Sequence, residues 1–340
     1  MTPPESSVDV VLVVPPFADV ERPALGPSLL AAALGQRGLR AAVVYPNLAW
    51  AERIGLPLYA WFANRGDADA ETTALALSSL VSEWVFADLA SERSASERMA
   101  TPSYEERFLA PALDPAALAR VLATLELREA FVCETVARIQ RLRPRIVGFT
   151  TTLASTTAGL AIARRLAAGP DRPLIVFGGS ACEGEMGAAL LDAFDVVDWV
   201  CSGEGEVAFV DFAAAIVAGE RPHVAGMRSR GGLPRTPAPV AMDSLPIPDF
   251  RDYFAALARS PLREQLRPRL PFESSRGCWW GQKHHCSFCG LNGATMQFRA
   301  KTPERALTEL RTLVDTWQIA DVEAVDNIVD HRYFASVFPR

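Results

Sequence analysis

The feature that most constrains the fold is an alternation of short β-branched runs with helical segments over the first 220 residues. Each run predicted as a strand is followed by a stretch with apolar residues at helical spacing. Because parallel strands need crossover connections, this pattern predicts an α/β fold, a doubly wound parallel sheet with helices on both faces. The predicted strands are 8–15, 40–45, 145–150, 173–177 and 196–201, and the predicted helices are 25–39, 158–168, 185–194 and 207–218.

Two segments interrupt the alternation. Residues 48–143 are rich in Ala, Leu, Glu and Arg without a strand pattern, which predicts a helical insert. This insert is either a cap over a ligand or a packing extension without ligand contact. Residues 221–270 are rich in proline, which predicts a connector with little regular structure. The chain then divides into an α/β domain at 1–220, the connector at 221–270 and a second unit at 271–340.

Composition excludes several classes of protein. The 340-residue chain has a net charge of −6, so it carries no basic field for nucleic acid. The N-terminus lacks the positive region of a signal peptide, and the apolar run 10–14 is too short to span a membrane. Cys133, Cys182 and Cys201 stand alone in apolar surroundings, which is typical of core residues rather than of a disulfide framework. We expect a cytoplasmic protein that binds neither nucleic acid nor membrane.

Three other cysteines form a compact motif in the second unit. Cys278, Cys286 and Cys289 have the spacing Cys-x7-Cys-x2-Cys, and no fourth cysteine follows. Three thiolates on one loop can hold three irons of a four-iron, four-sulfur cluster and leave the fourth iron open to a ligand. The alternative is a zinc site completed by His284 or His285, although zinc knuckles usually pair two close sets of ligands.

The order of elements around this loop is also informative. A short strand at 272–275 precedes the cysteines, and a helix capped by Thr302 runs from there to residue 317. A further strand is predicted at 321–326. Strand, loop, helix, strand is the order of a (β/α) barrel, whose reactive groups lie on the loops after the strands.

Residues 273–290 resemble the cluster loop of the radical S-adenosylmethionine (radical SAM) superfamily, including the aromatic Phe288 between the last two cysteines. The loop is four residues longer than the common Cys-x3-Cys-x2-Cys form. With its Trp279-Trp280-Gly281 run, it is similar to cobalamin-dependent members that mature ribosomally made peptides such as bacteriocins. Further matches fall in the same order as in those proteins: Pro15-Pro16-Phe17, Tyr45-Pro46-Asn47, Gly203-Glu204-Gly205-Glu206 and Leu245-Pro246-Ile247-Pro248-Asp249.

The resemblance implies three cofactors. A [4Fe-4S] cluster on the cysteines binds S-adenosylmethionine through its open iron and cleaves it reductively to a 5′-deoxyadenosyl radical. Cobalamin on the N-terminal domain then delivers a methyl group to carbon. The implied substrate is a precursor peptide, and the implied electron donor is of the flavodoxin or ferredoxin type. Related enzymes use the same cofactors for other rearrangements.

The resemblance also suggests residues for S-adenosylmethionine. Phe288 and Gly290 would lie beside its adenine, and Asp326 with Asn327 would face its methionine amino group. The usual Gly-Gly-Glu of the family is absent there, and a helix cap is the alternative role for these two residues.

Candidate contacts to cobalamin lie on the loops at the carboxyl ends of the predicted strands, where open parallel sheets bind ligands. Small residues there allow the backbone to approach a large ligand. The candidates are Thr151, Leu153, Gly178, Gly179, Gly203, Glu204 and Gly205. All four histidines lie after residue 220, so this domain offers no histidine to cobalt.

Only residues 290–340 follow the last cysteine, whereas a partial barrel of six units needs on the order of 200 residues. We therefore expect this sequence to be the front part of a longer protein. The alternative is a cobalamin-binding module with an incomplete barrel that binds at most an iron–sulfur cluster.

Overall fold

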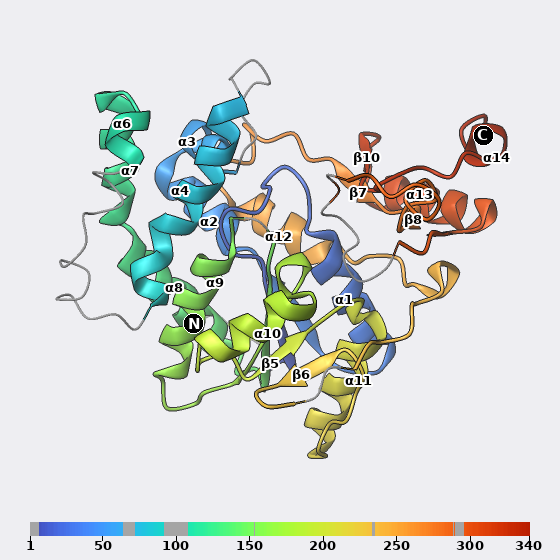
Figure 1. Ribbon diagram of the computed structural model, residues 1–340, viewed down its shortest axis with the longest axis horizontal. Coiled ribbons are helices and arrows are strands. Elements are labelled where there is room, and N and C mark those ends of the chain that lie inside the picture. Colours follow the sequence, from blue (N-terminus) through green and yellow to red (C-terminus); the bar gives the residue numbers. More distant parts are fainter. Residues whose placement is uncertain are drawn as a thin grey trace.

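The computed structural model describes residues 7–63, 72–91, 108–152, 154–232, 235–287, 289 and 296–340. Its centre is a six-stranded sheet in the order β2-β1-β3-β4-β5-β6 (Figure 1). The first five strands are parallel and the sixth is antiparallel to β5. They are β1 (Val10–Val13), β2 (Ala41–Val44), β3 (Ile146–Thr150), β4 (Leu174–Gly178), β5 (Trp199–Cys201) and β6 (Met227–Ser229). The predicted doubly wound parallel sheet is confirmed.

Burial explains why these runs form the sheet. All four residues of β1 are buried, as both faces of a central parallel strand must be. The edge strand β2 is only partly buried, and helix α12 (Arg251–Arg259) covers its open side. The Asp252 carboxylate accepts a hydrogen bond from the Val43 N–H at 2.7 Å. This bond satisfies a backbone donor that an edge strand would otherwise expose.

Helices cover both faces of the sheet. A Cβ built at Gly148 of β3 meets Phe209 of α11 (Gly205–Ala218), whereas a Cβ built on Gly159 of α9 (Thr156–Ala167) meets the next residue of β3, Phe149. Successive strand residues point to opposite faces, so α11 and α9 lie on opposite sides. Helix α1 (Leu25–Gln36) packs beside α11, and α10 (Gly184–Ala193) packs against β5 after the short turn η2 (Ser180–Cys182).

The insert between β2 and β3 is helical, as predicted, and the residues described there form helices joined by short turns. Its helices are α2 (Pro46–Ile54), α3 (Leu56–Phe62), α4 (Thr72–Ala90), α6 (Ala110–Ala112), α7 (Pro115–Leu125) and α8 (Arg128–Arg141). Trp50 of α2 lies 5.2 Å from Phe86 and 4.9 Å from Phe131, ring centre to ring centre. These aromatic contacts join the insert into one layer, which packs through α4 and α8 against α9 (Figure 1).

The connector contains more regular structure than its prolines predict. Besides β6 it holds the turn η3 (Met242–Ser244) and the amphipathic helix α12. Tyr253 and Leu257 of α12 are buried in the main core. Apolar residues at helical spacing therefore outweighed the surrounding prolines in this segment.

The second unit begins with a β–α–β arrangement. Strand β7 (Leu270–Phe272) pairs in parallel with β10 (Val322–Ala324), and α13 (Pro303–Trp317) connects them. The Thr302 side chain accepts a hydrogen bond from the Arg305 N–H at 3.3 Å, so the predicted helix cap is confirmed. A short helix, α14 (Tyr333–Ser336), follows. A separate core holds the unit together: Phe250, Leu270, Phe272, Ala306, Leu313, Tyr333 and Val337.

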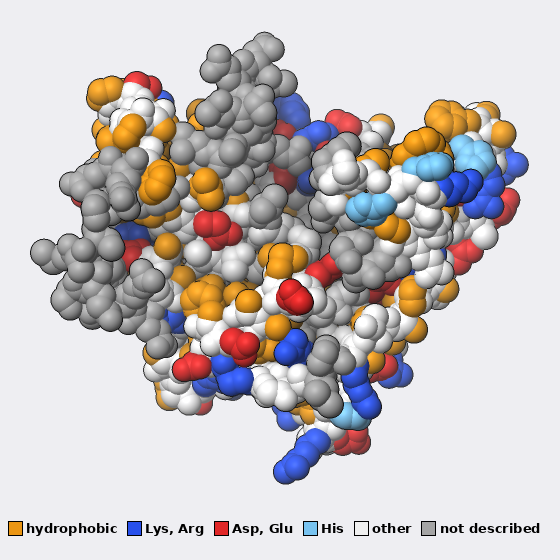
Figure 2. Space-filling view, in the orientation of Figure 1, with side chains coloured by type: hydrophobic (Ala, Val, Ile, Leu, Met, Phe, Trp, Pro, Cys, Tyr) orange, Lys and Arg blue, Asp and Glu red, His pale blue; other side chains and the backbone are white. Residues whose placement is uncertain are grey.

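The distribution of surface charge and the hydropathy of the helices agree with what the composition predicts. Figure 2 shows acidic and basic side chains interspersed over the visible face, without a broad basic field. Among the described residues, no helix has both the length and the apolar character needed to cross a bilayer.

Candidate functional site

The cysteine loop leaves and re-enters the second unit at a single point. Strand β8 (Ser275–Arg276) pairs antiparallel with β9 (Arg299–Ala300), which places Arg276 opposite Arg299. Two residues beyond Arg276, the Cys278 N–H donates to the Met296 carbonyl at 3.2 Å. The three cysteines therefore lie on a loop closed at its base by a short antiparallel stem.

Gly277 makes the close crossing at this base possible. Its φ of +77° is a left-handed conformation that favours glycine. A Cβ built on it would lie 2.1 Å from the carbonyl oxygen of Gln297, far inside van der Waals contact. Any side chain at this position would force the two arms of the stem apart.

Cys278, Cys286 and Cys289 are free cysteines, and each is half-buried. The Gly281 N–H donates to the Cys278 sulfur at 3.2 Å, and the Cys289 N–H donates to the Cys286 carbonyl at 3.0 Å. Three thiols on one loop, one already accepting an N–H, are chemically suited to an iron–sulfur cluster. Among the described residues, however, no three His, Cys, Asp or Glu side chains are grouped as metal ligands, and it is the three thiols themselves that point to a cluster. Phe288 and Gly290 lie outside the described residues.

Aromatic side chains flank the described part of the loop. The Trp279 indole N–H donates to the Val329 carbonyl at 3.1 Å and so ties the loop to the segment after β10. Trp280 is 48% exposed, and its ring lies 5.1 Å from that of His284. One tryptophan thus anchors the loop, and the other is open to solvent.

Asp326 lies where the sequence predicted, just past the end of β10. Its carboxylate accepts hydrogen bonds from the Ser274 and Ser275 N–H groups at 2.7 and 2.8 Å, and from the Ser274 hydroxyl. Burial raises the pKa of Asp326 despite these donors. In this structure the carboxylate joins β10 to the turn between β7 and β8, and the neighbouring Asn327 is exposed. Contact of either residue with S-adenosylmethionine stays a prediction.

The predicted cobalamin loops meet at the carboxyl edge of the large sheet. Thr151 is fully buried, and its hydroxyl contacts the Gly178 carbonyl at 3.0 Å and the Cys182 sulfur at 3.2 Å. Gly179 has a φ of +105°, and a Cβ there would lie 2.3 Å from the Thr151 carbonyl oxygen. These residues hold the β3 and β4 loops in close contact, beside the β1/β3 switch point where sheets of this order bind ligands. Leu153 lies outside the described residues.

The loop after β5 has a different environment. A Cβ built on Gly203 would lie 3.1 Å from the Pro237 side chain, and one on Gly205 would lie 3.3 Å from Leu30, so both glycines permit close packing. Glu204 points toward the second unit, where it pairs with Arg299 and accepts the Val240 N–H at 2.7 Å. Burial opposes ionisation of Glu204, but the hydrogen bond from Arg299 and the other donors outweigh it and lower its pKa.

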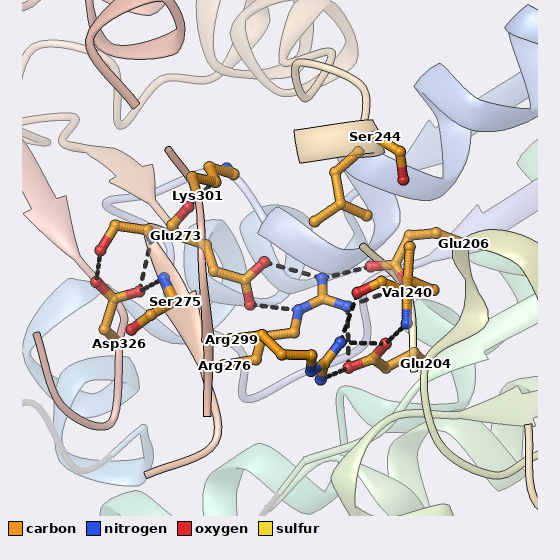
Figure 3. Close-up of polar contacts among 12 residues, drawn as sticks. Glu204, Glu206, Val240, Ser244, Glu273, Ser275, Arg276, Arg299, Lys301 and Asp326 are labelled. Carbon is orange, nitrogen blue, oxygen red and sulfur yellow. Dashed lines mark hydrogen bonds and ion pairs between the residues drawn. The ribbon is translucent and has the colours of Figure 1, made fainter. Parts of the chain in front are cut away.

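Arg276 stands at the centre of this contact, between the two units (Figure 3). Its guanidinium contacts Glu273 at 2.8 and 2.9 Å and Glu206 at 2.6 and 3.3 Å, and its Nη1 lies 3.6 Å from Glu204. Burial alone would lower the pKa of Arg276, but the charges of Glu206 and Glu273 outweigh it and raise the pKa. Sequence reasoning missed Arg276, Glu206 and Arg299 as site residues. The only signals were the Glu-Gly-Glu run and the i,i+3 spacing of Glu273 and Arg276.

The similarity of this chain to known proteins lies in its fold and not in its sequence. No protein-family description and no curated protein sequence matches this chain. Solved structures of similar fold include the following two. The first is a cobalamin-dependent S-adenosylmethionine radical enzyme, OxsB, with aqua-cobalamin bound, at a TM-score of 0.55 and 14% identity over 94% of this chain. The second is the radical S-adenosylmethionine methyltransferase TsrM from Kitasatospora setae, with cobalamin and a [4Fe-4S] cluster bound, at a TM-score of 0.50 and 15% identity over 94% of this chain.

The likeness covers nearly all of this chain but only part of those proteins. The match spans 34% of the OxsB chain and 49% of the TsrM chain. At this level of identity the comparison establishes the fold: an α/β sheet domain followed by a β–α–β unit, arranged as in cobalamin-dependent radical SAM enzymes.

Proposed function

We propose that this chain is the cobalamin- and cluster-binding part of a radical SAM enzyme. The observation that carries the proposal is the three-cysteine loop, which follows the first strand of a β–α–β unit and has its base closed by the β8–β9 stem. A fold shared with two enzymes of this class supports it.

The roles of the chain's own residues follow from their chemistry. Cys278, Cys286 and Cys289 would bind the cluster as thiolates, and S-adenosylmethionine would occupy its remaining iron. Gly277 keeps the stem closed beneath the loop. When bound, the cluster supplies an electron for cleavage of S-adenosylmethionine, and cobalamin supplies a methyl group.

Cobalamin would bind at the carboxyl edge of the sheet, where Thr151 and Gly179 hold two loops close together. The sequence before residue 220 contains no histidine, so cobalt would receive no imidazole from this domain. In the proposed reaction a carbon of a ribosomally made precursor peptide receives the methyl group, and a flavodoxin or ferredoxin supplies the electrons.

Anaerobic reconstitution of the full chain with iron and sulfide tests the cluster. We expect an electron paramagnetic resonance signal after reduction that changes when S-adenosylmethionine is added. Serine at Cys278, Cys286 or Cys289 should abolish the signal, whereas Cys133→Ser, at another half-buried free cysteine, should not. A signal that survives all three loop substitutions would rule out this assignment.

A second candidate function is a cobalamin-binding module without radical chemistry. The close contact between Thr151 and Gly179 at the carboxyl edge of the sheet, which does not involve the cysteine loop, favours it. It predicts that the chain retains cobalamin, with the visible absorption of the bound cofactor, but forms no 5′-deoxyadenosine. Zinc without iron or sulfide in purified protein would instead indicate a structural zinc site.

A further inference from the structure

The base of the cysteine loop carries two arginines that reach the same acidic loop of the large sheet. Arg276 is on β8 and Arg299 is directly opposite on β9. Arg276 pairs with Glu206 and Arg299 pairs with Glu204, and both acids follow β5. Both arms of the stem are therefore tied to one segment of the other unit.

The contacts of Arg276 fix an orientation as well as a distance. Its planar guanidinium makes two hydrogen bonds to Glu206 and two to Glu273, from different edges of the fork. Two-point pairing of this kind specifies an angle, which a single ammonium group cannot do. The Arg276 side chain is 15% exposed and that of Glu206 is 9% exposed, so solvent screens the pair only weakly.

Arg299 also contacts the connector, at Val240. Its Nη1 donates to the Val240 carbonyl at 2.6 Å, while the Val240 N–H donates to Glu204 at 2.7 Å. The stem, the connector and the loop after β5 thus share one set of polar contacts (Figure 3).

We propose that Arg276 and Arg299 are positioning residues that hold the cysteine loop in one orientation over the carboxyl edge of the large sheet. The orientation itself is a property of the unliganded chain. Only the identity of the groups held on either side, a cluster and cobalamin, rests on the proposed function.

The charges explain why loss of one arginine should release the loop. Three carboxylates, Glu204, Glu206 and Glu273, face two guanidinium groups, so acid is already in excess. Arg276→Met leaves Arg299 alone against three carboxylates that repel one another and are poorly solvated. Arg276→Lys keeps the charge but loses the fork, so it should restore the contact only in part.

Amide hydrogen exchange on the full chain without cofactors tests the proposal. In Arg276→Met, the Val240 and Cys278 amides should exchange about tenfold faster or more, because the contacts that protect them open. The control is Arg128→Met, which removes an arginine that is 13% exposed and pairs with Asp88 inside the helical insert. It should leave exchange at Val240 and Cys278 unchanged. Should Arg276→Met fail to fold, Glu206→Gln, which keeps the side-chain shape, is expected to give the same result. Unchanged exchange at both amides in the folded variant would overturn the proposal.

A second readout separates positioning from simple stability. In protein loaded with cob(II)alamin and a reduced cluster, pulsed electron paramagnetic resonance measures the distance between the two spins. We expect a narrow distribution for wild type and Arg128→Met, a broad one for Arg276→Met and an intermediate one for Arg276→Lys. The same narrow distribution in loaded Arg276→Met would contradict positioning. Failure of wild type to load would count against the proposed function and leave the exchange experiment to decide this inference.

Discussion

Replacing Gly277 by alanine tests the closed base of the cysteine loop. A φ of +77° costs an alanine about 1–2 kcal/mol, and its Cβ would lie 2.1 Å from the Gln297 carbonyl oxygen. Relieving that clash requires the stem to part, which breaks the Cys278 N–H bond to Met296 and costs about another 1 kcal/mol. With the two-residue β8–β9 pairing weakened as well, we expect a total of about 3 kcal/mol.

Gly231 provides the matched control. Its φ is +70°, nearly that of Gly277, but among the described residues beyond its two chain neighbours no atom lies within 4 Å of a Cβ built there. Gly231→Ala should therefore cost only about 1–2 kcal/mol of backbone strain and leave the loop closed.

The assay is hydrogen exchange at the Cys278 amide in unliganded protein, followed by iron content after reconstitution. A 3 kcal/mol loss confined to the stem corresponds to exchange about a hundredfold faster in Gly277→Ala. Iron content should fall in this variant and stay at the wild-type level in Gly231→Ala. Equal exchange rates at Cys278 in the two variants would refute the claim that the Gln297 contact, rather than φ alone, requires glycine.

Three further predictions follow from the packing. Burial raises the pKa of the Cys182 thiol from 9.0 to about 11, so at pH 8 only about one thiol in a thousand is ionised and iodoacetamide should spare it in the folded protein. The stability gained from keeping the buried Cys182 thiol neutral is complete below pH 9 and is lost as the pH rises toward 11. Rapid labelling of Cys182 in the native protein at pH 8 would contradict the raised pKa. Lys301 and Glu309 form an ion pair with both side chains 1% exposed, and Arg305 also contacts Glu309 at 2.9 Å. Because Arg305 still neutralises part of the Glu309 charge in Lys301→Met, this variant should destabilise the second unit by about 2–3 kcal/mol, below the full cost of an unpaired buried charge, and the Lys301→Met, Glu309→Leu double variant should recover part of that loss in urea unfolding. A double variant no more stable than the single one would argue that the Glu309 charge is not the source of the loss. Asp114 accepts hydrogen bonds from the Ala116 and Ala117 N–H groups at the start of α7. Asp114→Ala should therefore lower the free energy of unfolding by about 1 kcal/mol, measured by thermal unfolding. An unchanged Tm would show that this cap does not stabilise the protein.

Local sequence patterns predicted the large sheet because its strands are short apolar runs bounded by clear breaks. The run 146–150 forms β3, and the run 174–178 forms β4, each followed by the helix that the periodicity indicated. Helix α13 was predictable at its first residue because Thr302 and Pro303 are a cap and a first-turn signal. Helix α12 was missed because the surrounding prolines dominate the composition of its segment.

The contacts between the units could not be predicted in the same way. Arg276 and Glu206 are 70 residues apart, and their pairing depends on how the β–α–β unit docks on the sheet. Glu204 was expected at a cofactor loop and lies at this ion-pair cluster, since a single sequence does not show which way a loop side chain turns. Asp326 was placed at the correct end of β10, but its three donors come from a turn some fifty residues earlier.

The most direct test of the account is a Mössbauer measurement on the full chain reconstituted anaerobically with ⁵⁷Fe. We predict a four-iron cluster in which a single iron changes its isomer shift when S-adenosylmethionine is added, because three irons are held by Cys278, Cys286 and Cys289 and the fourth is open. A spectrum in which every iron is unchanged by S-adenosylmethionine, or a loop that binds zinc in place of iron, would contradict it.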